Sequence, residues 1–169
     1  MNGTRLASCI ALTIGLLVTA PAGATESEAE CVGPTSATKV YVTVEKIRSN
    51  DGLIAVTLYP DKMSRFLVKR GALFVRRVAA RAPTTQFCLF APEPGTYGIA
   101  IYHDANANYH IDRAGALGLP TEGFGFSNNA STLFGLPNFN SVRIKLHHDM
   151  HTAIRLRYLR GDEAQKAQP

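Results

Sequence analysis

The sequence lacks a segment of about 20 consecutive apolar residues, the length that a helix needs to cross a membrane. Its longest apolar run, Ile10 to Ala20, is shorter, and no later segment approaches that length. The sequence also lacks a glycine-rich loop followed by Lys-Ser or Lys-Thr, and it has no paired CxxC motifs. These absences predict a soluble protein without a membrane span, and they argue against a P-loop nucleotide site and a paired-CxxC zinc site.

Acidic residues are fewer than basic ones, 13 against 18, and the formal net charge is +5. We expect most of the basic side chains to lie on solvated strand faces. The alternative is contact with an anionic surface, such as envelope lipid or polysaccharide. No aromatic stacking pattern accompanies the charges, so nucleic acid is not an expected partner. The basic residues form two loose clusters, Lys69, Arg70, Arg76, Arg77 and Arg81 in one and Arg143, Lys145, Arg155, Arg157 and Arg160 in the other.

Residues 1–24 have the pattern of a secretory signal peptide. Arg5 precedes the apolar run, and Pro21 and three small residues follow it. We therefore expect an exported protein, periplasmic or extracellular. The rest of the chain divides into a polar lead-in (residues 25–37), one domain (38–160) and a polar tail (161–169), and the domain is long enough for one hydrophobic core.

Two cysteines lie outside the predicted signal peptide, Cys31 and Cys88. An oxidising compartment would let them pair, and the disulfide would tie the lead-in to a central strand. The alternative is two unpaired thiols. A catalytic thiol is not expected, because neither cysteine lies near a histidine in the sequence.

Alternating apolar and polar residues predict short strands. One contains Val40, Val42 and Val44, and Asn50-Asp51-Gly52 predicts a hairpin turn to a partner strand with Ile54, Val56 and Leu58. Residues 61–70 have helical spacing, with Asp61 as a cap and Gly71 as the end of the helix. Further strands are predicted at residues 73–79, 85–91, 97–101, 142–146 and 154–158.

The order of these elements predicts an all-β fold. About seven short strands without a long helix or a repeat indicate an antiparallel β-sandwich with Ig-like or transthyretin-like topology. Gly95-x-Tyr97 opens a strand after a turn, as in sandwich domains where a tyrosine hydroxyl bonds back to the preceding corner. One long end loop follows, and its many apolar residues predict that it is ordered.

The first part of this loop, from His103 to Asp112, has oxygen-bearing side chains at regular spacing. They occupy the first, third, fifth and ninth positions of a calcium-binding loop, where alternate side chains turn inward around a hard cation. His110 would contribute only its backbone carbonyl, and Glu122 would supply a further carboxylate from the far side of the loop. The predicted calcium ligands are Asp104, Asn106, Asn108, His110, Asp112 and Glu122.

The match to an EF-hand is incomplete. Tyr109 stands where the EF-hand has glycine, and Gly115 stands where it has a bidentate glutamate. The alternative is a purely hydrogen-bonded loop, because Asp and Asn in such runs also bond their own backbone. The second part of the loop, residues 118–129, mixes glycines with Phe124 and Phe126, which we expect to plug the end of the sandwich.

The segments HDANANYHID and GLPTEGFGFSNN, preceded by the strand with Gly95-x-Tyr97, resemble a family of exported bacterial proteins catalogued as domain of unknown function 2141. The resemblance covers roughly residues 38–158. It implies an all-β exported domain and brings no established activity or catalytic residues. The chain departs from the family pattern at Tyr109, where glycine is common.

Two other groups of residues have possible chemistry. His147, His148 and His151 are expected in a hairpin between the last two strands, either as a zinc or copper site or as a polar turn. In an enzyme, His103, Asp104 and Glu122 would act in a cleft beside the end loop. A triad of Ser127, His103 and Asp104 is disfavoured, because adjacent residues of a strand point to opposite faces.

The sequence therefore predicts an exported binding or structural module of the cell envelope that is not an enzyme. Its end loop is a candidate for stabilisation by calcium, and its partner would be an envelope protein, a glycan or an anionic surface. The alternative function is a hydrolase or other enzyme that uses His103, Asp104 and Glu122.

Overall fold

The computed structural model describes residues 31–114, 116, 118–133 and 135–159. The predicted signal peptide, residues 25–30 of the lead-in and the polar tail lie outside the described residues. Within the described part, no helix is long and apolar enough to cross a membrane.

The described chain is mostly β, as the sequence predicted. Its helical segments are short: the 3-10 turns η1 (Met63–Arg65) and η2 (Ser127–Asn129), and the single-turn helix α1 (Phe139–Val142). The ten strands are β1 (Thr38–Glu45), β2 (Leu53–Pro60), β3 (Phe74–Ala79), β4 (Thr84–Ala91), β5 (Gly95–Asp104), β6 (Arg113–Ala114), β7 (Leu119–Pro120), β8 (Phe124–Phe126), β9 (Arg143–Leu146) and β10 (Met150–Arg155).

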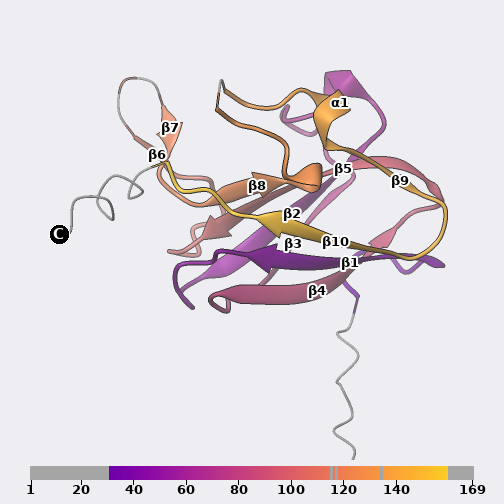
Figure 1. The fold of residues 1–169 in the computed structure, drawn as a ribbon, viewed down its shortest axis with the longest axis horizontal. Coiled ribbons are helices and arrows are strands. Elements are labelled where there is room, and N and C mark those ends of the chain that lie inside the picture. Colours follow the sequence, from indigo (N-terminus) through magenta and orange to yellow (C-terminus); the bar gives the residue numbers. More distant parts are fainter. Residues whose placement is uncertain (1–30, 115, 117, 134, 160–169) are drawn as a thin grey trace, which may run out of the picture.

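The strands form two larger sheets and one small one (Figure 1). One sheet has the order β10-β1-β4. The other has the order β3-β2-β5-β8, and β9 also pairs with β5. Strand β9 pairs with the beginning of β5 and β8 with its later part, so these two short strands extend the same sheet. Strands β6 and β7 form the small sheet within the end loop.

The two larger sheets pack face to face through one hydrophobic core. Val40, Val42 and Val44 of β1 alternate with half-buried residues and are at most 1% exposed. They belong to the same cluster as Ile54 and Val56 of β2, which lies in the other sheet. Burying a side chain of this size contributes about 1.5 to 3 kcal/mol, so this core is the main source of stability.

The prediction that β1 and β2 form a hairpin is wrong. Strand β1 pairs with β4 antiparallel and with β10 parallel, whereas β2 pairs with β3 and β5. The turn at Asn50-Asp51-Gly52 therefore carries the chain from one sheet to the other. The turn from His147 to Asp149 does the same between β9 and β10, so the second predicted hairpin and the fully antiparallel arrangement are also wrong. The physical reason is that a strand with one buried face has the same alternation whether its neighbour in sequence lies beside it or across the core.

The helix predicted over residues 61–70 is also wrong, because only η1 forms there. Leu67 and Arg70 have positive φ angles of 55° and 61°, which a right-handed helix does not tolerate. Asp61 caps no helix and instead forms an ion pair with Arg143 at 2.8 Å.

Two predicted links are confirmed. The hydroxyl of Tyr97 donates a hydrogen bond to the carbonyl of Glu93 at 2.8 Å, which is the predicted bond from a strand start to its preceding corner. Cys31 and Cys88 form a disulfide. Val32 adds to the edge of β4 beside it, donating its backbone N–H to the carbonyl of Cys88 at 2.8 Å.

Candidate functional site in the end loop

The end loop begins at Asp104, the last residue of β5, and contains β6, β7, β8, η2 and α1. Its starting point lies directly against the turn that enters β2. A Cβ atom on Gly52, which has a φ of 67°, would lie 2.0 Å from the carbonyl oxygen of Asp104. Only glycine therefore fits this turn, and the turn fixes where the loop begins.

Asp104 is fully buried and holds the first turn of the loop. Its Oδ1 accepts a hydrogen bond from the backbone N–H of Asn108 at 3.0 Å, and its Oδ2 accepts one from Tyr109 at 2.9 Å. Its carbonyl accepts a third from Ala107 at 3.2 Å. Hydrogen bonds to an ionised acceptor are about twice as strong as neutral ones, so this carboxylate is the main anchor of the loop.

Glu122 is a second buried anchor, 8% exposed, that reaches the loop from the opposite side. Its Oε1 accepts the N–H of Ala105 at 3.1 Å and its Oε2 accepts the N–H of Asp112 at 3.0 Å. Burial raises the pKa of Glu122, the two backbone N–H bonds partly lower it, and the charges of Asp112 and Asp104 raise it further. One carboxylate thus clamps both ends of residues 105–112.

Asp112 closes the loop through two side-chain amides. Its carboxylate accepts a hydrogen bond from Asn106 Nδ2 at 2.8 Å and one from Asn108 Nδ2 at 2.9 Å. The amide oxygens are also used, because Asn106 Oδ1 accepts the N–H of Asn108 at 3.2 Å and Asn108 Oδ1 accepts the N–H of His110 at 2.8 Å. The spacing that suggested inward-facing oxygens therefore produces a network of hydrogen bonds.

Tyr109 occupies the sixth position of the predicted calcium loop, and it takes the backbone conformation that glycine would take there. Its φ is 68°, which is costly for a residue with a side chain. Contacts with Arg77 offset part of that cost, because the guanidinium lies 4.5 Å from the centre of the Tyr109 ring and Nη2 donates to the Tyr109 carbonyl at 3.2 Å. Tyr109 therefore holds a backbone conformation that favours glycine.

The hydrogen bonds that the sequence offered as the alternative to a cation are present. A carboxylate has about four acceptor positions, and the carboxylates of Asp104, Asp112 and Glu122 each use two. Among the described residues, no group of three or more His, Cys, Asp and Glu side chains is placed to hold a metal ion. Calcium in this loop stays a prediction.

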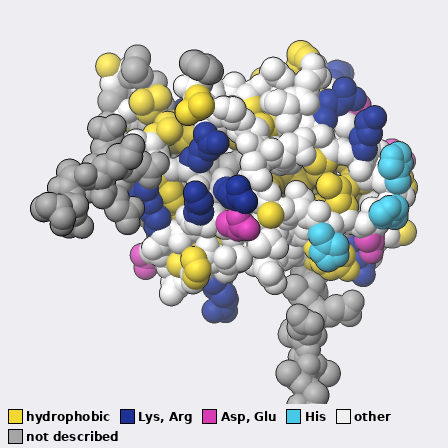
Figure 2. All heavy atoms as spheres, viewed as in Figure 1, with side chains coloured by type: hydrophobic (Ala, Val, Ile, Leu, Met, Phe, Trp, Pro, Cys, Tyr) yellow, Lys and Arg dark blue, Asp and Glu magenta, His cyan; other side chains and the backbone are white. Residues whose placement is uncertain are grey.

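The histidine cluster lies away from the loop, with His147 and His148 in the turn between β9 and β10 and His151 in β10. Figure 2 shows histidine side chains gathered at one edge of the molecule. The ring of His151 stacks on Tyr41 of β1 at 4.6 Å between ring centres. His148 Nδ1 lies 2.8 Å from the carbonyl of Asp149. His147, His148 and His151 are all exposed, and their metal binding also stays a prediction.

His103 belongs to a buried network with polar partners on both ring nitrogens. It is 2% exposed, with Nε2 at 2.8 Å from the carbonyl of Asp51 and Nδ1 at 3.0 Å from the hydroxyl of Tyr158. Because a carbonyl only accepts, the contact with Asp51 is a hydrogen bond that Nε2 donates. Burial raises the pKa of Tyr158, and the hydrogen bond from Arg48 partly lowers it.

The residues of the enzyme alternative are buried and engaged in hydrogen bonds within the fold. His103, Asp104 and Glu122 are all buried, and none lines the three hollows described below. Ser127 is also fully buried, and its Oγ accepts the N–H of Ile99 at 3.0 Å. Use of these residues in an enzyme stays a prediction.

Sequence reasoning missed the surface around Phe124. Phe124 and Phe126 do not plug the end of the sandwich. They belong to a second hydrophobic cluster, with Tyr59, Phe66 and Phe139, on the outer face of the five-stranded sheet. The signal in the sequence was a set of leucines spread over the segment after residue 118. The structure leaves four of them exposed, Leu119, Leu133, Leu136 and Leu159.

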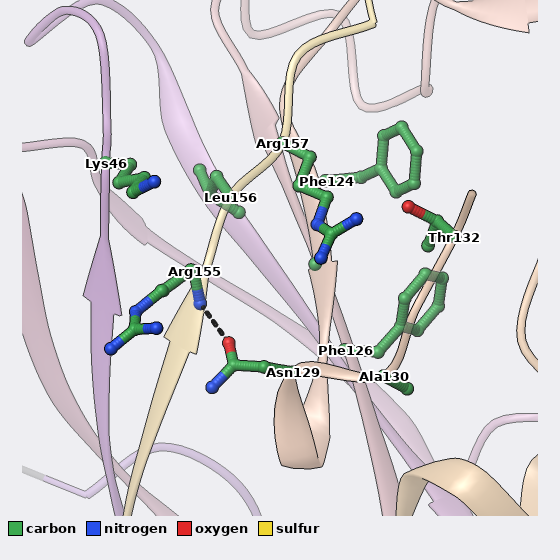
Figure 3. A pocket seen from close by; sticks show the side chains of 10 residues that line it. Lys46, Phe124, Phe126, Asn129, Ala130, Thr132, Arg155, Leu156 and Arg157 are labelled. Carbon is green, nitrogen blue, oxygen red and sulfur yellow. Dashed lines mark hydrogen bonds between the residues drawn. The ribbon is translucent and has the colours of Figure 1, made fainter.

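Three hollows surround Phe124, and we call them the Phe124 hollows. The first, about 300 Å³, lies over Tyr59, Tyr102 and Leu136. The second, about 530 Å³, extends from Arg113 past Leu136 to Leu159. The third, about 170 Å³, is a notch between η2 and the end of β10, lined by Lys46 and Arg157 among others (Figure 3).

A family model described as an uncharacterized protein conserved in bacteria (DUF2141) matches residues 42–155 of the chain. No curated protein and no solved structure matches it.

Proposed function

Because the chain belongs to the DUF2141 family of uncharacterized bacterial proteins, whose description names no activity, we propose its function from the end loop: a non-enzymatic binding module of the cell envelope, with a loop that calcium stiffens. The observation that carries the proposal is the arrangement around Asp104. A fully buried carboxylate accepts the backbone N–H groups of Asn108 and Tyr109 and so holds the first turn of the loop.

The backbone supports calcium in particular. Asp104 accepts N–H groups from the fifth and sixth positions of the loop, and Tyr109 at the sixth position has the positive φ that a glycine provides in calcium-binding loops. Asp112, at the ninth position, is partly exposed, so a cation can reach it from solvent. Glu122 adds a third carboxylate behind the loop.

The disulfide supports the compartment. A bond between Cys31 and Cys88 persists in oxidising surroundings such as the periplasm or the extracellular space. We infer that the protein is exported and that its partner is another envelope component, a protein, a glycan or an anionic surface.

A calcium titration tests the proposal. With a dissociation constant of about 0.5 mM, in the range of extracellular calcium modules, 10 mM calcium adds about 1.8 kcal/mol to the free energy of unfolding. We expect the melting temperature to rise by about 4 to 7 °C. The measurement is thermal unfolding followed by circular dichroism, in calcium, in an equal concentration of magnesium and in chelator.

The matched variants are Asp112→Asn in the loop and Asp61→Asn outside it. Asp112→Asn keeps the size of the side chain and removes a charged ligand, so we expect it to abolish most of the calcium shift. Asp61→Asn removes an exposed carboxylate that pairs with Arg143, and it should leave the shift intact. A wild-type melting temperature that calcium leaves unchanged, or a shift that both variants retain in full, would remove calcium from the proposal.

A further inference from the structure

The outer face of the five-stranded sheet is apolar, although the opposite face of this sheet already forms the main core. Tyr59 of β2 and Phe124 and Phe126 of β8 belong to a cluster on this outer face, and Ala100 and Tyr102 of β5 pack against it. A sheet with one face in the core normally turns polar residues to its other face. The outer face of the five-stranded sheet is therefore a second apolar surface.

The end loop covers this surface incompletely. The first two Phe124 hollows share Arg113, Pro120, Phe124 and Leu136 in their linings, so they lie next to each other. Their volumes, about 300 and 530 Å³, are those of small-molecule sites. Leu136 and Leu133 at the margin are 57% and 76% exposed, and apolar side chains gathered around a hollow mark a contact surface.

The charged residues that line the Phe124 hollows are all basic. Lys69 and Arg113 line the apolar hollows, and Lys46, Arg155 and Arg157 line the notch. None of the described residues that line the three hollows is acidic. Figure 2 shows hydrophobic side chains on one side of this face next to several lysines and arginines, with an acidic side chain directly beside these basic ones.

The notch is the place for a negative group. Arg155 is already paired with Glu45 at 2.9 Å. The ammonium of Lys46 and the guanidinium of Arg157 point toward the notch from two sides, with Phe124 and Phe126 beyond them (Figure 3). Lys46 and Arg157 are both exposed, so a ligand can reach them without rearrangement of the fold.

We propose that the Phe124 hollows bind a single-chain amphiphile with an anionic head group, such as a long-chain carboxylate. The head group lies in the notch between Lys46 and Arg157, and the chain runs over Phe124 toward Leu136. This inference rests on the proposed function of a binding module and names the class of its ligand. It does not require calcium.

Another segment of the same chain fits the hollows less well. Leu159 lines the second hollow, but the residues that follow it in sequence, RGDEAQKAQP, are polar, with alanine as their only aliphatic residue. They offer little apolar surface to exchange for contact with Phe124. An amphiphile satisfies both the apolar floor and the surrounding positive charge.

The test uses cis-parinaric acid, a fluorescent long-chain carboxylate, and its methyl ester as an uncharged control ligand. We expect saturable binding of the acid by the mature protein. The double variant Lys46→Gln/Arg157→Gln should weaken binding of the acid about tenfold and leave the ester nearly unchanged, because it removes only the charge contacts. Leu136→Ser should weaken both ligands about fivefold by removing apolar contact.

Two matched control variants lie outside the hollows. Lys145→Gln removes an exposed cation of β9, and Leu73→Ser removes a leucine that is 38% exposed and lines none of the three hollows. Both should bind the acid and the ester as the wild type does. Circular dichroism checks that every variant is folded.

Three results would overturn the inference. They are an absence of saturable binding, binding that neither Leu136→Ser nor the double variant changes, and a dimer in light scattering that Leu136→Ser dissociates, which would assign this face to a second copy of the chain. A calcium-dependent melting temperature without probe binding keeps the proposed function and refutes this inference. Probe binding without a calcium effect on the melting temperature keeps this inference and removes calcium from the proposed function.

Discussion

Replacing Asp104 tests whether one buried carboxylate organises the end loop. Asp104→Ala removes two hydrogen bonds to an ionised acceptor, at 3.0 and 2.9 Å, each contributing about 1.5 to 3 kcal/mol. The N–H groups that lose this partner belong to the exposed residues Asn108 and Tyr109, so water replaces part of the loss. Removing a buried charge also removes its desolvation cost. We expect a net loss of about 2 to 4 kcal/mol in the free energy of unfolding.

The assay is urea unfolding followed by far-ultraviolet circular dichroism, because the chain contains no tryptophan. Asp104→Asn keeps one acceptor oxygen and presents an NH₂ group to the other N–H, so it should lose about half as much stability as Asp104→Ala. Asn106→Ala removes hydrogen bonds from an exposed residue of the same loop and should cost less than about 1 kcal/mol. If Asp104→Ala and Asn106→Ala have the same unfolding midpoint, the anchor is not Asp104.

Three further predictions concern a backbone conformation, a titration and the disulfide. Tyr109→Val should lower the free energy of unfolding by about 1 to 2 kcal/mol, because a β-branched residue tolerates the φ of 68° poorly. Tyr109→Gly should be nearly neutral, because glycine adopts this φ without strain and this offsets the lost contact with Arg77. Equal urea midpoints for the two variants would refute this prediction. Burial raises the pKa of Glu122, so the folded protein holds the carboxyl proton more tightly than the unfolded chain does. The free energy of unfolding of the wild type relative to Glu122→Gln should therefore fall as pH rises from the ordinary glutamate pKa through the raised value. A difference between the two proteins that stays constant between pH 4.5 and pH 7 would contradict this prediction. Cys31→Ser should lower the free energy of unfolding by about 2 to 4 kcal/mol. Reducing agent should lower the urea midpoint of the wild type to that of the variant and leave the midpoint of the variant unchanged. A wild-type midpoint that reducing agent does not change would show that the Cys31–Cys88 bond does not stabilise the fold.

The strands were predictable from the sequence, but the pairing of two neighbours was not. Val40, Val42 and Val44 indicate a strand with one buried face, and Ile54 and Val56 indicate another. The same alternation arises whether the two strands lie side by side or face one another across the core. A turn such as Asn50-Asp51-Gly52 serves both connections, so the sequence did not distinguish a hairpin from a crossing between sheets.

The candidate site was predictable in its residues and only partly in its contacts. The spacing of Asp104, Asn106 and Asn108 indicated side chains turned into one loop, and the structure places them so. Glu122 was expected as a distant carboxylate, but its two bonds to backbone N–H groups depend on the return of the chain after β6 and β7, which no local pattern encodes. The surface around Phe124 was missed because the sequence does not distinguish a loop aromatic that closes the end of the sandwich from one that covers the outer face of a sheet.

The parallel pairing of β1 with β10 has a consequence for how the chain reaches its native state. Val40 pairs with Met150 and Val44 with Ile154, so the central strand of the three-stranded sheet obtains one neighbour only after almost the whole domain has been synthesised. Pairings between residues so distant in sequence slow folding, because a long loop must close before the contact forms. A ribosome-bound chain that stops before residue 150 should therefore be protease-sensitive at β1.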